Sequence, residues 1–167
     1  MASMKRALLA LLALVVLFFG VRAVVRALAS DETKIRGVLE DMTDGFNETR
    51  MNPVLAGLDA QFLDENLGAD RDLVRAGLAQ LFLQSKDAQT KKFPYRVTLP
   101  AEELKIVVQQ GDPRTAEVEL VALFEESHGE TWKPTWKIHV EAQLALLPGG
   151  WRIRHTKTTE LEGKLLR

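Results

Sequence analysis

The sequence predicts an α+β domain that follows an amino-terminal membrane segment. Three observations lead to this prediction. The chain opens on an apolar stretch without acidic residues, its apolar residues recur three and four positions apart up to about residue 82, and they alternate with polar residues from about residue 95 onward. The first spacing is typical of amphipathic helices, and alternation is typical of strands with one buried face. We therefore expect three helices followed by an antiparallel sheet whose apolar face the helices cover.

Residues 1–30 contain the longest apolar run of the chain, Ala7–Val21. This run of about 15 residues is shorter than the roughly 20 that cross the hydrocarbon core of a bilayer. Counted over residues 7–29, however, a helix would be about 35 Å long at 1.5 Å per residue. Arg22 and Arg26 lie four positions apart on one face of that helix, from which they can extend to the headgroups. We predict a single-pass signal anchor that contacts the lipid bilayer through residues 7–29.

Two alternatives for this segment stay open. The triplet Ala27-Leu28-Ala29 before Ser30 matches the small-x-small pattern of a signal-peptidase site, so the segment is also compatible with a cleaved signal peptide. A surface-lying amphipathic helix is the other alternative. Lys5 and Arg6 at the start are typical of an export signal, whereas the basic residues after the apolar run favour a cytoplasmic carboxyl side. We expect a membrane protein whose domain is extracytoplasmic.

Residues 31–167 form one predicted domain with a mildly acidic surface. All 23 acidic residues but only 18 of the 22 basic ones lie after residue 30, which gives this part a formal charge of −5. Nucleic-acid binding requires many positive charges, so no nucleic-acid partner is expected. The chain has no cysteine, and no phosphate loop, nucleophile elbow or paired-histidine motif occurs. The sequence therefore predicts no metal and no cofactor.

Three helices are expected at the start of this domain. The first carries an apolar stripe formed by Ile35, Val38, Leu39, Met42 and Phe46. The second begins at Asn52-Pro53, a typical cap followed by a typical first position, and extends past Asp59 and Phe62 towards a stop at Gly68. The third is capped by Asp70 and turns its apolar face inward through Leu73, Val74, Gly77, Leu78, Leu81 and Phe82. A polar connector, 86–92, then leads into the strands.

The strands are expected in two short and three long segments. The short ones are Tyr95–Leu99 and Leu104–Gln109. The long ones have apolar faces formed by Ala116, Val118, Leu120, Ala122 and Phe124, then by Trp136, Ile138, Val140, Ala142, Leu144 and Leu146, and finally by Trp151, Ile153 and His155. Turn residues separate them, namely Gly111-Asp112-Pro113, Ser127–Glu130 and Pro148-Gly149-Gly150. The opposite face of these strands is charged.

This order of elements resembles the nuclear transport factor 2-like superfamily, which includes the SnoaL-like proteins. The hairpin at 147–153, Leu-Pro-Gly-Gly-Trp-Arg-Ile, is similar to a hairpin of that group. Arg71-Asp72, which open the third helix after Gly68, are similar to its Gly-Arg-acidic helix start. The resemblance implies three N-terminal helices packed on the concave face of a curved, cone-shaped antiparallel sheet. It also implies an apolar concave pocket that serves isomerases, dehydratases and cyclases in some members, and binding or assembly in others.

Four residues are candidates for a ligand-binding pocket on the concave face: Tyr95, Trp136, Trp151 and His155. His155 is the candidate catalytic residue, because an imidazole is a general base near neutral pH. Tyr95 and Asp59 are its possible assistants in a proton transfer. Trp136 and Trp151 are expected to face each other across adjacent strands. The alternative is that the tryptophans, Tyr95 and His155 only fill the core.

Three residues are candidates for contact with a partner: Val121, Leu123 and Trp132. Val121 and Leu123 interrupt the charges of the outer sheet face and would form the apolar centre of a homodimer interface. Trp132 lies in a hairpin arm near Pro134, where a proline is compatible with an edge strand. Besides a homodimer, an envelope protein is a possible partner.

The leading hypothesis is a membrane-anchored, non-enzymatic binding or assembly module of a cell-envelope complex. One anchor followed by one such domain resembles the architecture of the inner-membrane scaffold subunits of bacterial type IV secretion systems and of actinobacterial envelope-transport accessory proteins. The alternatives are a small-molecule lyase or isomerase that uses His155, and a carrier of apolar ligands.

Overall fold

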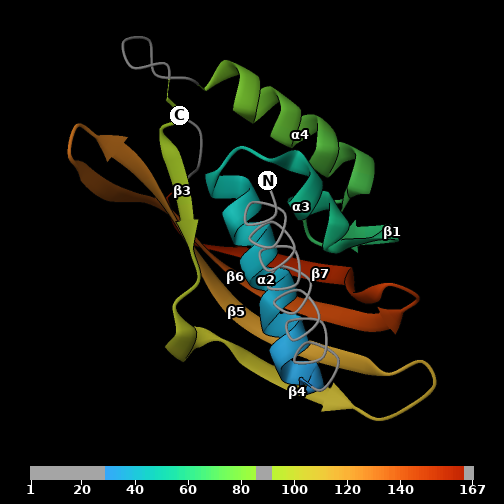
Figure 1. Ribbon diagram of the computed structural model, residues 1–167. Coiled ribbons are helices and arrows are strands. Elements are labelled where there is room, and N and C mark those ends of the chain that lie inside the picture. Colours follow the sequence, from blue (N-terminus) through green and yellow to red (C-terminus); the bar gives the residue numbers. More distant parts are fainter. Residues whose placement is uncertain (1–28, 86–91, 164–167) are drawn as a thin grey trace, which may run out of the picture.

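The computed structural model describes residues 29–85 and 92–163, in which three helices cover one side of a strongly curved sheet (Figure 1). The helices are α2 (Asp31–Asn47), α3 (Met51–Ala56) and α4 (Arg71–Gln84), with a 3-10 turn η1 (Ala101–Glu103). The strands are β1 (Leu58–Asp64), β2 (Ala69–Asp70), β3 (Tyr95–Thr98), β4 (Lys105–Gln109), β5 (Thr115–His128), β6 (Thr131–Leu147) and β7 (Gly150–Gly163). The strand order is β2-β1-β7-β6-β5-β3, and β4 also pairs with β5.

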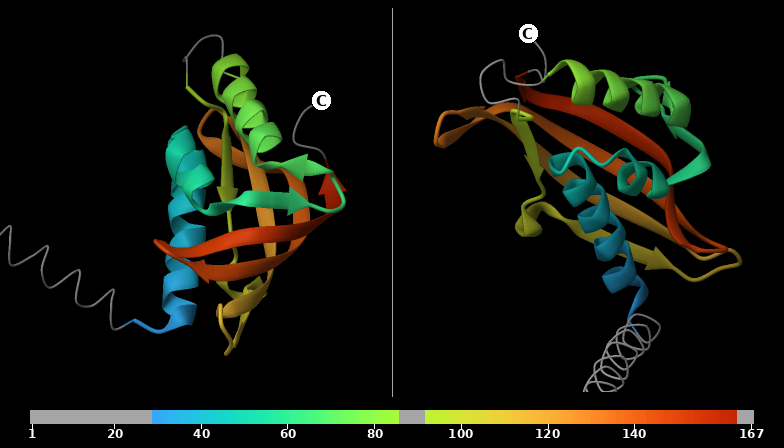
Figure 2. Two further views of the ribbon diagram at one scale, coloured as in Figure 1. Left: turned by 90° about the vertical axis from the view of Figure 1, so that its right-hand side faces the viewer. Right: turned by 45° about the horizontal axis from the view of Figure 1, so that its top comes forward.

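The predicted α+β class is confirmed, but the sheet is mixed and not purely antiparallel. The long strands β5, β6 and β7 form an antiparallel meander. β1 joins its edge in parallel with β7, pairing Leu58 with Ile153 and Leu63 with His155. Figure 2 shows how the sheet bends around α2 while α3 and α4 close one end.

The first and third predicted helices are present; the third has the predicted cap, Asp70, and the first is capped by Ser30. The Ser30 hydroxyl accepts a hydrogen bond from the Thr33 amide at 3.2 Å, and the Asp70 carboxylate accepts one from the Leu73 amide at 2.7 Å. These caps satisfy amides that have no partner inside a helix. In α4, however, the Leu73 side chain is 56% exposed, so the inward face of this helix is narrower than predicted.

The second predicted helix is wrong beyond Ala56, because the chain enters β1 there. The Gly57 carbonyl accepts a hydrogen bond from the Ile153 amide at 2.9 Å, which ties this point to β7. Leu58 and Phe62 are both buried and lie four positions apart, a spacing that also fits a helix. This segment forms a strand because it pairs with β7, which is distant in the sequence.

The concave side of the sheet is filled by side chains. Ile35, Leu144 and Trp151 are the largest fully buried residues. Around Trp136 of β6, aromatic rings pack edge to face or tilted with centroids 5.0–5.8 Å apart; these belong to Phe46, Phe82, Phe93, Tyr95, Phe124 and Trp136. Such aromatic packing stabilises a core beyond the burial of area alone.

Within residues 29–85 and 92–163, no helix has the length and apolar character to cross a membrane. The predicted membrane anchor, apart from Ala29 and Ser30, lies outside the described residues, and so does the connector at 86–91.

Replacing Leu144 by alanine is expected to destabilise the domain by about 2–5 kcal/mol, because this side chain is 1% exposed and its removal leaves a cavity. Leu83→Ala is the matched control: Leu83 is 74% exposed, and its loss should change stability by less than about 0.5 kcal/mol. Urea unfolding followed by tryptophan fluorescence measures both. Equal effects of the two substitutions would contradict a filled interior.

Candidate functional site

A β-bulge in β7 decides on which face of the sheet His155 lies. Ile153 is paired with Leu144 and His155 with Gln143, so the extra residue Arg154 has no partner on β6. An extra residue shifts the alternation of side chains by one position. Trp151 and Ile153 therefore face the helices, whereas His155 lies on the outer face. The prediction that His155 points to the concave side is wrong for this reason.

The extra residue Arg154 forms an ion pair with a buried carboxylate, Asp59. The Arg154 Nε atom donates a hydrogen bond to Asp59 Oδ2 at 2.7 Å, and Asp59 is 8% exposed. This hydrogen bond is the main reason that the pKa of Asp59 lies below its ordinary value, against the opposing effect of burial. Asp59 lies in β1 and not on a helix, and its carboxylate is engaged by Arg154.

Trp136 and Trp151 do not face each other. Trp136 lies opposite Gly163, and Trp151 lies opposite Leu146, so they occupy opposite ends of the β6–β7 pair. Trp151 is 1% exposed, and its Nε1 atom donates to Asp31 Oδ1 at 3.4 Å. Trp151 is thus a core residue that also fixes the start of α2.

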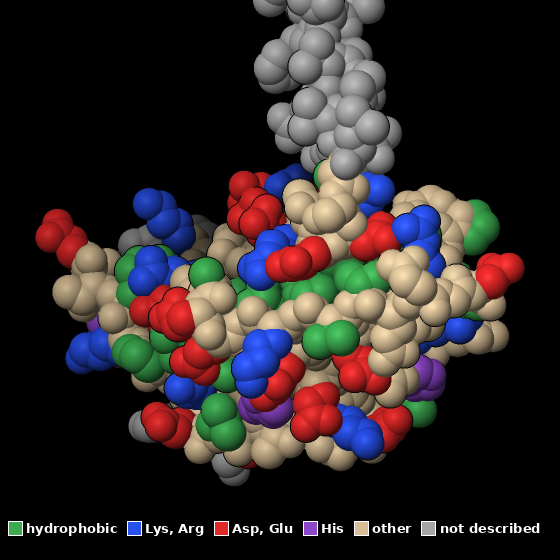
Figure 3. Space-filling view, turned by 90° about the horizontal axis from the view of Figure 1, so that it is seen from below, with side chains coloured by type: hydrophobic (Ala, Val, Ile, Leu, Met, Phe, Trp, Pro, Cys, Tyr) green, Lys and Arg blue, Asp and Glu red, His purple; other side chains and the backbone are tan. Residues whose placement is uncertain are grey.

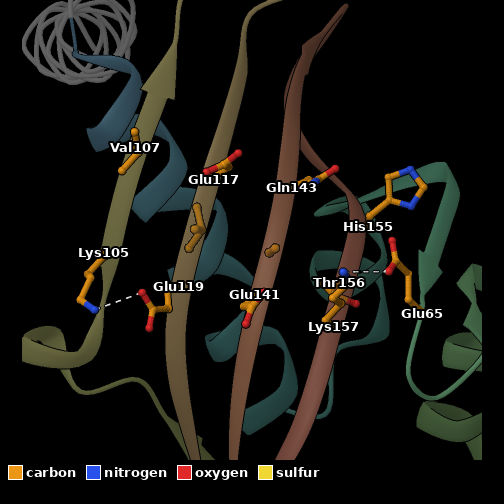
Figure 4. A pocket seen from close by; sticks show the side chains of 12 residues that line it. Glu65, Lys105, Val107, Glu117, Glu119, Glu141, Gln143, His155, Thr156 and Lys157 are labelled. Atoms are coloured by element: carbon orange, nitrogen blue, oxygen red, sulfur yellow. Dashed lines mark hydrogen bonds and ion pairs between the residues drawn. The ribbon is translucent and has the colours of Figure 1, made fainter.

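The outer face around His155 forms an open groove of about 490 Å³, which Figure 4 shows from close by. Two rows of side chains cross the strands β4, β5, β6 and β7. One row consists of Val107, Glu117, Gln143 and His155. The other consists of Lys105, Glu119, Glu141 and Lys157. Lys105 pairs with Glu119 at 3.0 Å along the second row, and Lys157 pairs with Glu65 at 3.3 Å.

The charges of this groove have an acidic excess. Glu119 accepts a hydrogen bond from Lys105 and lies 3.2 Å from His139 Nε2, and these two contacts lower its pKa, the one to Lys105 most. Four glutamates and two lysines line the groove. Figure 3, a view from below, shows acidic and basic side chains interspersed on that side of the molecule. Such a surface is suited to polar recognition, and it holds no cysteine or serine nucleophile.

His155 has an unusual environment in this groove. Its Nδ1 atom is buried and has no hydrogen-bond partner among the described residues. A buried polar atom without a partner costs free energy, so such atoms are uncommon in folded proteins. No group of three or more His, Asp or Glu side chains in the described ranges could hold a metal ion.

The three predicted partner contacts differ in exposure. Val121 is 7% exposed. The turn η1 contacts β5, the strand that carries Val121, and the Glu103 carboxylate of this turn lies 3.8 Å from the Lys137 ammonium of β6. Val121 therefore does not form an exposed apolar centre, contrary to the prediction. Leu123 is partly buried. Trp132 is 37% exposed, with the guanidinium of Arg96 4.5 Å above its ring.

A second depression, of about 630 Å³, brings together two of the four predicted pocket residues, Tyr95 and Trp136. It lies where β7 ends opposite Trp136 and β6 continues into the hairpin arm. Burial and the neighbouring Glu126 raise the pKa of Tyr95. The Trp136 Nε1 atom is buried without a hydrogen-bond partner in this part of the chain. His155 and Trp151 do not line this depression.

Two further carboxylates with several hydrogen bonds, the buried Asp64 and the partly buried Asp31, were not predicted as functional or structural residues. Asp64 is 3% exposed and accepts hydrogen bonds from the hydroxyls of Thr156 and Thr158 at 2.8 and 2.6 Å, and from two backbone amides of the turn that follows it. Asp31 accepts from Arg114 Nη1 at 2.5 Å and from Trp151. The only signal for Asp64 was its place before Glu-Asn-Leu-Gly, a turn sequence that an aspartate can cap.

Comparison with known proteins identifies the fold. No protein-family model and no curated protein matches the sequence. An NTF2-like protein with a cystatin-like fold from Novosphingobium aromaticivorans aligns with a TM-score of 0.62 at 14% identity, over 87% of this chain and 90% of that one. A protein of unknown function with a cystatin-like fold from Nostoc punctiforme gives 0.60 at 12% identity, over 81% and 95%. A putative Ca/calmodulin-dependent kinase II association domain from Exiguobacterium sibiricum gives 0.53 at 13% identity, over 81% and 97%.

These likenesses show that the domain has the cystatin-like, NTF2-like fold, as the predicted resemblance implied. At 12–14% identity these likenesses show the fold and do not show what the protein does. The class defined by fold and site is thus an NTF2-like α+β domain with a filled interior and a polar outer groove.

Asp59→Asn is expected to destabilise the domain by about 1–3 kcal/mol at neutral pH, because a charge-assisted hydrogen bond in a buried place is weakened. Since the pKa of Asp59 is lowered by folding, its contribution is present above its ordinary pKa of 3.8 and is lost as the pH falls through the lowered value. The difference between variant and parent should therefore shrink towards pH 3 in urea unfolding. Asp72→Asn is the control, because Asp72 is exposed and pairs with Arg75 only at the surface. A difference that persists unchanged at pH 3 would refute the role of the ion pair.

Proposed function

We propose that the protein is a membrane-anchored, non-enzymatic binding or assembly module whose outer sheet groove contacts a partner protein of the cell envelope. The observation that carries this proposal is the packed concave side, on which Trp151, Leu144 and Ile35 are fully buried. The enzymatic alternative loses its candidate base, because His155 lies on the outer face while Tyr95 lines a different depression. Anchoring rests on the apolar run of residues 7–29.

The chemistry of the groove favours a basic partner. Glu65, Glu117, Glu119 and Glu141 outnumber Lys105 and Lys157, so a surface with lysines or arginines is complementary. A homodimer centred on the groove is disfavoured by the same charges. In any two-fold arrangement centred on the row Lys105–Glu119–Glu141–Lys157, the two central glutamates face those of the copy. A heterologous envelope partner therefore fits better than a second copy of the chain.

The test is site-specific photo-crosslinking of the full chain in its native membrane. A crosslinker at Gln143, in the groove, should give one defined adduct that Glu119→Lys together with Glu141→Lys abolishes, because charge reversal repels a basic surface. A crosslinker at Gln80, on the exposed side of α4, is the matched control and should give no such adduct. An adduct of twice the chain mass would support the homodimer instead, and unchanged crosslinking after charge reversal would contradict the proposal.

A second candidate function, the binding of an apolar ligand with a hydrogen-bond acceptor, is favoured by the depression at Tyr95. The unpartnered Trp136 indole N–H and the Lys133 ammonium are donors there, and the rings of Tyr95 and Trp136 are apolar walls. A carrier role at this place needs no catalytic group.

Dodecanoate is a suitable probe for this second function, since it combines an apolar chain with an acceptor. Saturable binding, followed by calorimetry, should weaken about tenfold in Trp136→Phe, which removes one hydrogen bond worth about 1.5 kcal/mol. Trp132→Phe is the matched control, because Trp132 lies outside the depression. Equal binding by both variants would exclude Trp136 as the donor.

A further inference from the structure

The first turn of α2 is locked to one end of the sheet. The Asp31 carboxylate, 12% exposed, accepts from Arg114 Nη1 at 2.5 Å and from Trp151 Nε1 at 3.4 Å. The Leu146 amide donates to the Arg114 carbonyl at 2.9 Å and joins the end of β6 to the same point. Asp31 therefore ties the start of β5, the end of β6 and the start of β7 together, and it is the positioning residue of this end.

Asp31 also lies next to the predicted membrane segment. Only Ser30 separates it from Ala29, the last residue of the run 7–29. Two steps of the chain cover at most about 8 Å, and the headgroup layer on one side of a bilayer is about 5–7 Å deep. If residues 7–29 insert, Asp31 lies within the headgroup layer or at its outer boundary. The start of β5, the end of β6 and the start of β7, which Asp31 holds together, then lie near the headgroups as well.

We infer that the domain stands on the membrane with the β4–β5 turn and the β6–β7 turn against the lipid headgroups. This inference rests on the proposed membrane anchor. The tips of the two turns, 110–113 and 148–149, carry one charged side chain, Asp112, and otherwise glutamine, glycine and proline, so close approach to the headgroups desolvates no more than this one charge. Figure 1 shows the first turn of α2 and β4 at the lower end of the molecule and α4 at the upper end.

The orientation has a consequence for the candidate partner contacts. β5 is a strand of 14 residues that runs from Thr115 at the membrane end to His128. At about 3.3 Å per residue it spans roughly 45 Å away from the membrane. The outer groove therefore opens to the side of the domain and not towards the bilayer. The hairpin arm with Trp132 is then the part of the sheet farthest from the lipid. A partner of the groove would have to stand beside the domain and not above it.

The test uses single cysteines, because the chain has none of its own. Full-length protein in vesicles of phosphatidylcholine and phosphatidylglycerol carries a fluorophore at Gln110→Cys or Pro148→Cys near the proposed contact, or at Gln80→Cys or Glu130→Cys far from it. Spin-labelled headgroups quench a fluorophore that lies close to them. We expect quenching at the first pair to exceed that at the second several-fold. Equal quenching at the four positions, or the reverse order, would overturn the inference.

The lock itself is tested with Asp31→Ala, and Asp72→Ala is the matched control on α4. Without the contacts of Asp31 the domain can change its orientation on the membrane. The ratio of quenching between the near and the far positions should therefore fall towards one in Asp31→Ala and stay several-fold in Asp72→Ala. Circular dichroism verifies that Asp31→Ala is folded. If this variant does not fold, the difference in quenching between the two pairs of positions in the parent chain still tests the inference. Co-sedimentation separates the two proposals: a chain that does not sediment with the vesicles overturns the anchor and with it the inference, whereas a chain that sediments without the difference in quenching overturns the inference alone.

Discussion

The bulge at Arg154, whose side chain pairs with Asp59, is the constraint on which the arrangement of β7 and β1 depends. Before the bulge, Ile153 pairs with Leu58, and after it His155 pairs with Leu63. The register between β1 and β7 is irregular over this stretch, and the Arg154–Asp59 ion pair lies within it. A buried carboxylate and a guanidinium satisfy each other where the regular ladder is interrupted. The pair therefore allows β1 to join the meander at an irregular place.

The same bulge determines what faces the helices further along β7. Thr156 and Thr158 face inward after it, and their hydroxyls find an acceptor in the buried Asp64. Without the shift, His155 and Lys157 would face the interior, where two ionisable side chains would lack partners and be costly to bury. The polar network at Asp64 and the charged groove outside are thus two results of one inserted residue.

The sequence allowed the long periodic elements to be predicted, since α2, α4, β5 and β6 bury one face over many residues. It did not reveal β1, because Leu58 and Phe62 fit a helix as well as a strand and only their pairing with β7 decides. The bulge escaped for a similar reason: alternation continues through Arg152, Ile153 and Arg154 without a glycine or a turn residue. The separation of the tryptophans, in contrast, was predictable. A turn at 148–149 places Trp151 opposite Leu146 and leaves Trp136 far along the strand.

The stability of the domain does not explain why its outer face is so highly charged. Lys105 and Glu119 are 70% and 47% exposed, and an exposed pair of this kind contributes little to stability because solvent screens it. Glu119 and Glu141 lie directly opposite each other on adjacent strands, an arrangement of like charges that destabilises a sheet. Charges that cost stability in the isolated domain are understandable where they select a partner, because complementary charge increases the association rate and excludes wrong partners.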